Sequence, residues 1–280
     1  MKIFNKIAII GVGLIGGSLG LAVRKKRIAG EVIGIARRES SRKKALKFKA
    51  VGSATLDFKK AIKDADLVVL AVPVGKIIGL AQKAVRGMKK GAILTDVGSS
   101  KENIVRKAEK IAGKKVHFIG SHPMAGSDKK SVENASSGIF ANAPLILTKT
   151  KNTDKKSLNR LIKFWQSLGC RVFVISPEKH DKFVSLSSYL PHVISYTLSF
   201  SQTKDSVKFA GGSLKDTTRV ASSDTDLWKD IFLLSRKRVL NSIRVFSGNL
   251  RLLERAIIKK DQNSIKKFLK KAKGIRDNIN

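Results

Sequence analysis

The chain begins with a glycine-rich turn between an apolar run and a helix-like segment. Residues 7–10 are apolar, and the glycines that follow, Gly11, Gly13 and Gly16, have the spacing G-x-G-x-x-G. Gly11 allows a tight turn, Gly13 leaves bare backbone for a pyrophosphate, and Gly16 lets the helix approach the strand with its positive end toward the anion. This order of strand, turn and helix predicts a Rossmann-type dinucleotide site.

Apolar runs and helix-like segments alternate over the first 175 residues. Alternation at this spacing predicts an α/β fold with a doubly wound, mostly parallel sheet. Ligands of such sheets bind beyond the carboxyl ends of the strands, so the segments that follow the strands are the candidates for chemistry. The expected strands lie near residues 7–10, 32–35, 66–72, 92–96, 116–119, 145–147 and 172–175, and the expected helices around 42–50, 57–63, 76–86, 101–112 and 154–168.

The pattern changes after residue 175, and only helices are expected beyond it. A helix over 178–202 contains Pro191, which predicts a kink. Asp224 is expected to cap a later helix whose apolar positions recur at steps of three and four residues. A helix of about 34 residues would be about 50 Å long, which is more than a small domain covers. We therefore expect a Rossmann domain over 1–175 and an all-α dimerisation domain over 176–280.

The formal net charge of +36 raises the question of a nucleic-acid partner. The cations are mostly scattered as pairs, and the one compact run, 24–27, lies at the expected end of the first helix, where cations are favourable. No aromatic residues interleave with this run to stack on bases. We expect a lysine-rich solvated surface that attracts anionic substrates and cofactors, and no nucleic-acid partner. A basic nucleic-acid-binding protein on a Rossmann scaffold is the remote alternative.

Three features predict a cytoplasmic protein with no membrane partner. No signal peptide is visible before the glycine turn, and the apolar run 67–74 is too short to cross a bilayer. The single cysteine, Cys170, cannot form a disulfide within the chain, which fits a reducing compartment.

Several later segments carry chemistry and occur in a specific order. They are D-V-G-S-S-K at 96–101, S-H-P-M-A-G-S at 121–127, S-P-E-K-H-D at 176–181, L-P-H at 190–192 and G-G-S-L-K-D-T-T-R at 211–219. With G-V-G-L-I-G-G-S at 11–18, these segments make the chain resemble the prephenate/arogenate dehydrogenase family of tyrosine biosynthesis over nearly its full length. A hydroxy-acid or pyrroline reductase with the same cofactor domain is an alternative against which the S-H-P-M-A-G and L-P-H segments argue.

The resemblance implies a Rossmann domain, a helical domain that forms a homodimer, and an NAD(P)-dependent oxidative decarboxylation. Prephenate would become 4-hydroxyphenylpyruvate, or arogenate would become tyrosine. The two substrates differ in whether the side chain carries a ketone or an amine, and no single residue of the sequence decides between them. The excess positive charge favours the more anionic prephenate.

The same resemblance assigns roles to five residues. His122 is expected to accept the proton of the ring hydroxyl as a neutral imidazole, with Ser99 sharing that hydroxyl. Arg219 is expected to bind a carboxylate through two parallel bonds. His192 is expected to bind the substrate as well, and Lys215 to add charge. No metal is expected, because formation of the aromatic ring drives the decarboxylation.

Four other aromatic side chains receive weaker assignments. His117 and His180 are expected to be structural, and Trp228 to pack close to the pocket. Many members of the family carry histidine where this chain has Tyr189, so the contribution of this residue stays open; a phenol can still donate a hydrogen bond.

The end of the second expected strand bears on the choice between NAD and NADP. An acidic side chain about 20 residues after the last motif glycine would hold the ribose hydroxyls of NAD. This position is Ala36, which cannot do so, whereas Arg37 can pair with a 2′-phosphate. We therefore favour NADP, although Glu39 or a backbone group could support NAD. The residues expected to hold the cofactor are Gly11, Gly13, Leu14, Ile15, Gly16, Arg37 and Val72.

Overall fold

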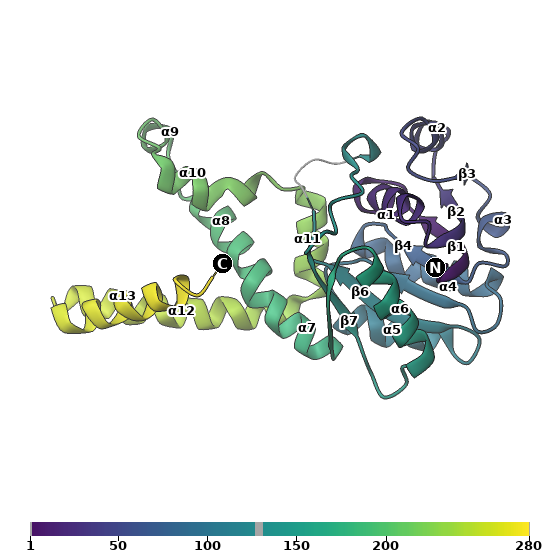
Figure 1. Cartoon of the computed structure of the whole chain (residues 1–280). Coiled ribbons are helices and arrows are strands. Elements are labelled where there is room, and N and C mark those ends of the chain that lie inside the picture. The colour runs from purple at the N-terminus through teal and green to yellow at the C-terminus, as the bar shows by residue number, and fades with distance from the viewer. Residues whose placement is uncertain (1, 127–130, 280) are drawn as a thin grey trace.

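One sheet of eight strands forms the centre of the structure, a computed structural model that describes residues 2–126 and 131–279 (Figure 1). The strand order is β3-β2-β1-β4-β5-β6-β7-β8. The first six strands pair in parallel, while β7 runs antiparallel to β6 and parallel to β8. This confirms the predicted mostly parallel sheet. The strands are β1 Phe4–Ile10, β2 Ala29–Ile35, β3 Ser53–Thr55, β4 Leu67–Leu70, β5 Ile93–Asp96, β6 His117–Pro123, β7 Pro144–Thr148 and β8 Arg171–Ile175.

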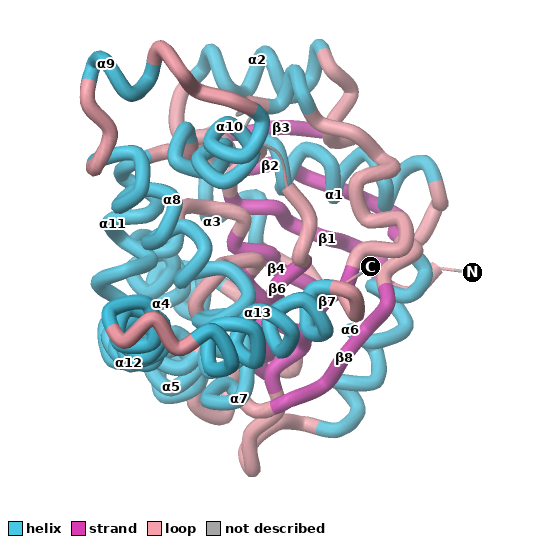
Figure 2. Tube along the Cα trace, turned by 90° about the vertical axis from the view of Figure 1, so that its left-hand side faces the viewer, coloured by secondary structure: helices cyan, strands magenta, loops and turns pink. Residues whose placement is uncertain are grey.

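Helices cover both faces of the sheet, which Figure 2 shows edge-on. Helices α1 and α6 lie on one side of the strands, while α4 and α5 lie on the other together with helices of the second half of the chain. The helices of the first half are α1 Leu14–Lys25, α2 Glu39–Lys47, α3 Phe58–Ile62, α4 Ile77–Gly87, α5 Glu102–Ala112 and α6 Lys155–Ser167.

The central strands are mostly apolar because both of their faces are buried. In β1, Ile7 and Ile9 belong to the core under α1 and α6, whereas Ala8 and Ile10 belong to the core under α4 and α5. Side chains alternate between the two faces of a strand, so a strand covered on both faces needs an uninterrupted apolar sequence. This is the signal from which the sequence predicted the inner strands.

The glycine turn joins β1 to α1 by a close approach of backbone to backbone. Gly11 has φ +95°, and a Cβ at this residue would collide with the carbonyl oxygen of Ala71. A Cβ at Gly16 would collide in turn with the carbonyl oxygen of Gly11. Any side chain at either position would therefore push α1 away from the strands and displace its first turn.

Helices make up the remainder of the chain and extend away from the sheet, to the left in Figure 1. α7 continues through a π-helical turn, Ser185–Tyr189, into α8, so the irregular backbone lies directly before Pro191. Among the described residues no helix is long and apolar enough to cross a membrane. The helices are α7 Pro177–Val184, α8 Leu190–Phe200, α9 Lys204–Val207, α10 Gly212–Thr218, α11 Thr225–Leu234, α12 Arg236–Ile258 and α13 Gln262–Arg276.

The single long helix predicted from Asp224 onward is wrong. Asp224 does cap a helix, since its side chain accepts a hydrogen bond from the Leu227 amide, but this helix, α11, ends at Leu234. The chain turns at Ser235 and continues as α12, after which α13 folds back against α12. The apolar periodicity persists across the turn because both helices bury one face, so the pattern alone does not reveal the break.

The two halves of the chain share one hydrophobic core. The buried cluster beneath α4 and α5 also contains Val184, Tyr189, Trp228 and Val239 from the C-terminal helices. These helices are therefore fixed against the sheet by packing, and side chains from both halves can form one site.

Candidate active site

The carboxyl ends of β1, β4, β5 and β6 meet at one edge of the sheet, because these strands are parallel. The glycine turn follows β1, Val72 follows β4, Ser99 follows β5, and His122 lies near the end of β6. The structure thus brings together the candidate cofactor and catalytic segments, as expected for a doubly wound sheet.

The start of α1 fits the pyrophosphate of a dinucleotide. Its N-cap, Gly13, makes no side-chain capping bond, and no acidic residue occurs in the first turn, so the amides there are available to an anion. No atom lies within 4 Å of where a Cβ of Gly13 would be, so a ligand can approach the backbone. Leu14 and Ile15 are half-buried at the same helix end, and Val72 packs against Gly11.

Positive charge lies at the end of β2, where the adenosine ribose of a dinucleotide would be bound. Ala36 is buried, and its amide donates to the carbonyl oxygen of Thr55. Arg37 is exposed, with no hydrogen bond or ion pair to another described residue. Glu39 is already engaged by Arg42, whose guanidinium donates to both carboxylate oxygens at 2.8 and 2.6 Å.

His122 is the first of three residues in a buried polar chain. Its Nδ1 lies 2.8 Å from Nε2 of His180, and Nδ1 of His180 lies 2.7 Å from Oδ1 of Asp181. His122 is 7% exposed, and His180 is fully buried. Nε2 of His122 makes no hydrogen bond within residues 2–126 and 131–279. The last residue of the S-H-P-M-A-G-S segment, Ser127, lies outside the described residues.

The first turn of α5 fixes the carboxylate of Asp181. The amide of Lys101 donates to Oδ1 at 2.8 Å, and the amide of Glu102 donates to Oδ2 at 3.0 Å. A carboxylate interacts favourably with the positive end of a helix.

The hydrogen bond between His180 and Asp181 determines which ring nitrogens carry protons. Asp181 accepts from Nδ1–H of His180, so Nε2 of a neutral His180 is an acceptor. His122 then donates through Nδ1–H, which leaves the lone pair of a neutral His122 on Nε2. The chain of three residues thus orients His122 as a proton acceptor.

Burial keeps both imidazoles neutral. It holds the pKa of His122 well below its usual range, and positive charge on His180 or Lys101 lowers that pKa further. Burial also lowers the pKa of His180, although the hydrogen bond to Asp181 opposes this shift. A neutral His122 can accept a proton at physiological pH.

Ser99 and Tyr189 connect this cluster to the C-terminal helices. Ser99 is half-buried, and its carbonyl oxygen accepts a hydrogen bond of 2.7 Å from the buried Tyr189 hydroxyl. The hydroxyl of Ser99 makes no hydrogen bond to a described residue. Tyr189, whose contribution the sequence left open, therefore anchors the loop that carries Ser99.

The candidate substrate-binding residues lie on α8 and the turn after α10. The His192 ring stacks on Trp228, with centroids 3.5 Å apart, and its Nδ1 lies 2.9 Å from the Ser188 carbonyl oxygen. Burial lowers the pKa of His192, and the positive charge of nearby Arg219 lowers it further. Arg219 is exposed, and Lys215 is exposed on α10 without a hydrogen bond or ion pair to another described residue.

Sequence interpretation missed the parts of the cluster that depend on tertiary contacts. His180 was expected to be structural, yet it touches His122 from 58 positions along the chain. Asp181, Asp96 and Lys101 lay inside quoted segments without receiving a role. No group of three His, Cys, Asp or Glu residues in the described part of the chain could hold a metal ion.

Comparison with known proteins identifies the family. The model of the prephenate dehydrogenase nucleotide-binding domain matches residues 19–174, and that of the prephenate dehydrogenase dimerization domain matches residues 176–271. The chain is 32% identical to the prephenate dehydrogenase of Bacillus subtilis over 98% of this chain and 76% of that protein.

Two solved structures share the whole fold. The Aquifex aeolicus prephenate dehydrogenase in complex with hydroxyphenyl propionate and NAD+ has a TM-score of 0.92 at 32% identity, covering 99% of this chain and 98% of that one. Synechocystis arogenate dehydrogenase has a TM-score of 0.86 at 28% identity, covering 97% and 99%. The chain belongs to the prephenate dehydrogenase family of nicotinamide-dependent oxidoreductases.

Proposed function

We propose that this chain is a prephenate dehydrogenase, which oxidatively decarboxylates prephenate to 4-hydroxyphenylpyruvate. The observation that carries the proposal is the His122–His180–Asp181 chain at the edge of a dinucleotide-binding sheet. It provides an oriented, neutral base beside the place where the cofactor turn and the C-terminal helices meet.

His122 is proposed to accept the proton of the ring hydroxyl through Nε2. A bound oxidised nicotinamide supplies the acceptor for the hydride of the carbon that bears this hydroxyl. Asp181 stabilises the positive charge that forms on His122, through His180. When the ring carboxylate leaves as carbon dioxide, its electron pair completes the aromatic ring and the oxygen recovers a proton from His122. Ser99 is proposed to share the hydroxyl, since its own hydroxyl is free of partners among the described residues.

Arg219, His192 and Lys215 are proposed to bind the substrate. Neither Arg219 nor Lys215 forms an ion pair with a residue in the described part of the chain, and Arg219 is close enough to His192 to lower its pKa. A guanidinium can bind a carboxylate through two parallel hydrogen bonds. Replacing Arg219 by Gln should raise KM for prephenate about tenfold or more with a smaller effect on kcat. The control is Arg244→Gln on α12, and an unchanged KM in R219Q would remove Arg219 from the site.

NADP is proposed as the preferred cofactor. Arg37 is free to pair with a 2′-phosphate, while Arg42 engages the Glu39 carboxylate that could otherwise bind ribose hydroxyls. The Aquifex aeolicus relative was solved with NAD+, so the two cofactors must be compared directly. We expect kcat/KM to be higher with NADP, and to fall toward the NAD value in Arg37→Ser. A preference for NAD of about tenfold would overturn the assignment.

Arogenate is the second candidate substrate, because the Synechocystis neighbour is an arogenate dehydrogenase. The net charge of +36 favours prephenate, the more anionic of the two. The test is formation of reduced nicotinamide with prephenate and arogenate side by side, at matched concentrations. Higher kcat/KM with prephenate is expected, and higher kcat/KM with arogenate would assign the chain to that substrate.

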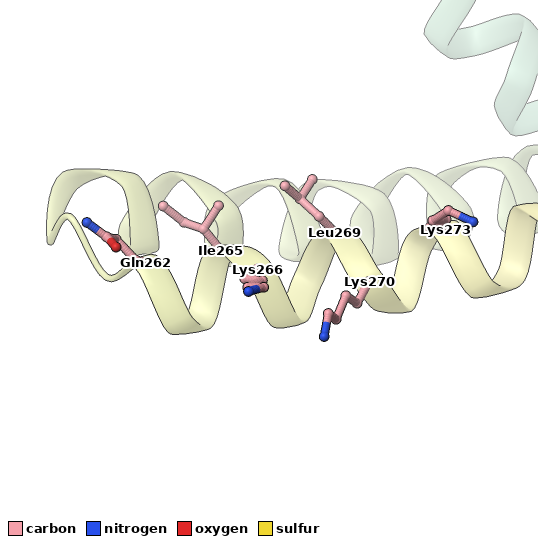
Figure 3. Close-up of a pocket in the computed structure, with 6 residues that line it drawn as sticks. All are labelled: Gln262, Ile265, Lys266, Leu269, Lys270 and Lys273. Atoms are coloured by element: carbon pink, nitrogen blue, oxygen red, sulfur yellow. The ribbon is translucent and has the colours of Figure 1, made fainter.

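A homodimer through the C-terminal helices is proposed as the working assembly. Phe200 and Phe209 are 93% and 87% exposed there, and apolar side chains also remain uncovered along α12 and α13. On α13, Ile265 and Leu269 point to one side of the helix, while Lys270 points to the other (Figure 3). An apolar surface of this extent is typical of a protein–protein interface.

A further inference from the structure

We propose that Lys101, paired with Asp96, is a positioning residue that keeps the His122–His180 pair neutral and aligned. The inference rests on the proposed function, in which His122 is the base. Neither residue received a role from the sequence, and neither is part of the chain of hydrogen bonds that ends at His122.

The ion pair of Lys101 and Asp96 is entirely removed from solvent. Both side chains are 0% exposed, and Nζ of Lys101 lies 2.5 Å from Oδ2 of Asp96. The ammonium also donates to the Ser100 carbonyl oxygen at 3.2 Å, and Oδ2 of Asp96 accepts from the Gly98 amide at 2.9 Å. Isolated charges of this kind are costly to bury, so each residue depends on the other.

Lys101 contacts both structures that orient His122. Its aliphatic stem runs beneath Gly120 of β6, where an added Cβ would come within 2.9 Å of Cδ of Lys101. Gly120 is two residues before His122 on the same strand. The backbone amide of Lys101 donates to Asp181, the carboxylate that orients His180. Lys101 thus supports the strand that carries His122. It also holds Asp181, the carboxylate at the other end of the His122–His180–Asp181 chain.

The charged and titratable groups around the two imidazoles come from four places. Asp96 ends β5, Lys101 is the N-cap of α5, Asp181 lies on α7, and the neutral Tyr189 hydroxyl lies on the π-helical turn. Glu102 is also near but is paired with Arg238 at 3.0 Å.

Lys101 is the only fixed cation in this set that acts on both imidazoles within the described residues. Its positive charge opposes protonation of each ring, whereas Asp181 and Asp96 favour protonation of His180. Without the ammonium, burial would favour the neutral form of Asp96, and the Asp181 carboxylate would act on the two imidazoles with no opposing cation from Lys101. A base that is already protonated cannot accept the substrate proton.

A purely structural ion pair would produce different results. Loss of such a pair lowers the stability of the fold but leaves the pKa of His122 where burial sets it. The chain offers a control, since Lys89 and Asp66 form an ion pair of 2.6 Å at the amino-terminal end of β4, the opposite end of the strands from His122.

The experiment is an NMR titration of the free protein labelled at its histidines, of which there are only four. The variants are Lys101→Met, which keeps the aliphatic stem, and the double variant D96N/K101M, which leaves no buried charge unpaired. In both, the pKa of His122 should rise by about 1 unit or more, while K101R and the control K89M should leave it near the wild-type value. An unchanged His122 titration in D96N/K101M would overturn the proposal even if K101M fails to fold.

A second measurement separates this inference from the proposed function. If wild-type protein oxidises prephenate, the acid limb of its kcat/KM profile should move to higher pH in D96N/K101M by the shift seen in the titration. If the titration shifts but wild-type protein does not turn over prephenate, the proposed function fails while the electrostatic role of Lys101 stands. If wild-type protein is active and D96N/K101M changes neither the pKa of His122 nor the acid limb of the kcat/KM profile, Lys101 has only a structural role.

Discussion

His122 can act as a base only while its imidazole is neutral, and the surrounding residues secure that state. Burial disfavours the charged ring, and Asp181 fixes the tautomer from the far side of His180. In the proposed reaction, the same arrangement would provide a counter-charge when the ring takes up a proton. Orientation and electrostatics thus come from one set of contacts.

Replacing His122 by Asn should lower kcat by about 10²–10⁴-fold with little change in cofactor affinity, because the amide cannot accept the proton. The matched control is His117→Asn at the start of the same strand, which should retain activity. Steady-state kinetics and fluorescence titration with reduced cofactor measure the two effects. More than a few per cent residual activity in H122N would show that another group is the base.

Acid pH should lower both activity and stability. Because the folded protein holds the pKa of His122 and His180 below 6.5, the unfolded chain binds more protons as pH falls through that value. Each of these imidazoles should then remove up to about 1.4 kcal/mol of unfolding free energy per pH unit, whereas stability is unaffected above the unfolded pKa. Urea unfolding at several pH values between 5 and 8 measures this slope. If the unfolding free energy did not change below pH 6.5 in either the wild type or His180→Asn, the predicted loss of stability at acid pH would be contradicted.

The lowered pKa of His122 also determines the pH at which activity is lost. Since the folded pKa of His122 lies well below 6.5, kcat/KM should stay level as pH falls to 6.5 and decline only at lower pH. A decline centred above pH 7 would point to a different ionising group.

The turn between α11 and α12 fastens the C-terminal helices to the loop that carries Ser99. The Ser235 hydroxyl donates to the Ser100 hydroxyl at 2.9 Å, and the side-chain amide of Asn103 donates to the Leu234 carbonyl oxygen at 2.7 Å. The second bond satisfies a carbonyl group at the end of α11, where no helical partner exists. These bonds connect the C-terminal helices that carry the candidate substrate-binding residues to the loop that carries Ser99.

Replacing Asn103 by Ala should destabilise the fold by about 1 kcal/mol, because the carbonyl group of Leu234 would lose its partner in a half-buried place. It should also raise KM for prephenate, since the α11 turn positions Trp228. Asn241→Ala, at an exposed position of α12, is the control for both quantities. Equal unfolding free energies for the two variants would show that this bond does not hold the turn.

Sequence patterns predicted the elements whose stability is local or whose two faces are buried. The inner strands are short apolar runs between turns, and all of them were found. β3 was missed because it has only three residues, Ser53–Thr55, at the edge of the sheet. The break at Ser235 was missed because it is fixed by hydrogen bonds to Ser100 and Asn103, which lie more than a hundred residues earlier.

The residues of the candidate site also differ in whether the sequence could predict them. The glycine turn could be located because it lies between a strand and a helix, and His122 because its segment matches the pattern of the family. His180 and Lys101 could not, since their relation to His122 exists only after α7 packs against α5 and β6. A buried lysine is also indistinguishable by sequence from the other cations of a chain with 57 of them.

At the scale of the whole molecule, a high positive charge coexists with a large uncovered apolar surface. The cations give each chain a net charge of +36, so two copies repel at long range. The exposed apolar side chains of α12 and α13 favour association at short range. Dimer formation should therefore strengthen with added salt, which screens the repulsion and leaves the apolar contact intact.

Replacing Leu250 on α12 by Glu should shift the protein toward monomer, because a carboxylate would be buried in an apolar interface. The control is Leu56→Glu, an exposed position on the first half of the chain, which should not alter assembly. Sedimentation velocity at low and high salt measures both effects. A monomeric wild-type protein at every salt concentration would refute the dimer.

The most direct test of the account is a crystal structure of the protein with oxidised cofactor and a substrate analogue that retains the ring hydroxyl. We expect Nε2 of His122 to lie within hydrogen-bond distance of that hydroxyl, about 2.6–3.2 Å, with Nδ1 still bonded to His180. A hydroxyl placed beyond the reach of Nε2, and contacted instead by another acceptor, would contradict the assignment of His122 as the base.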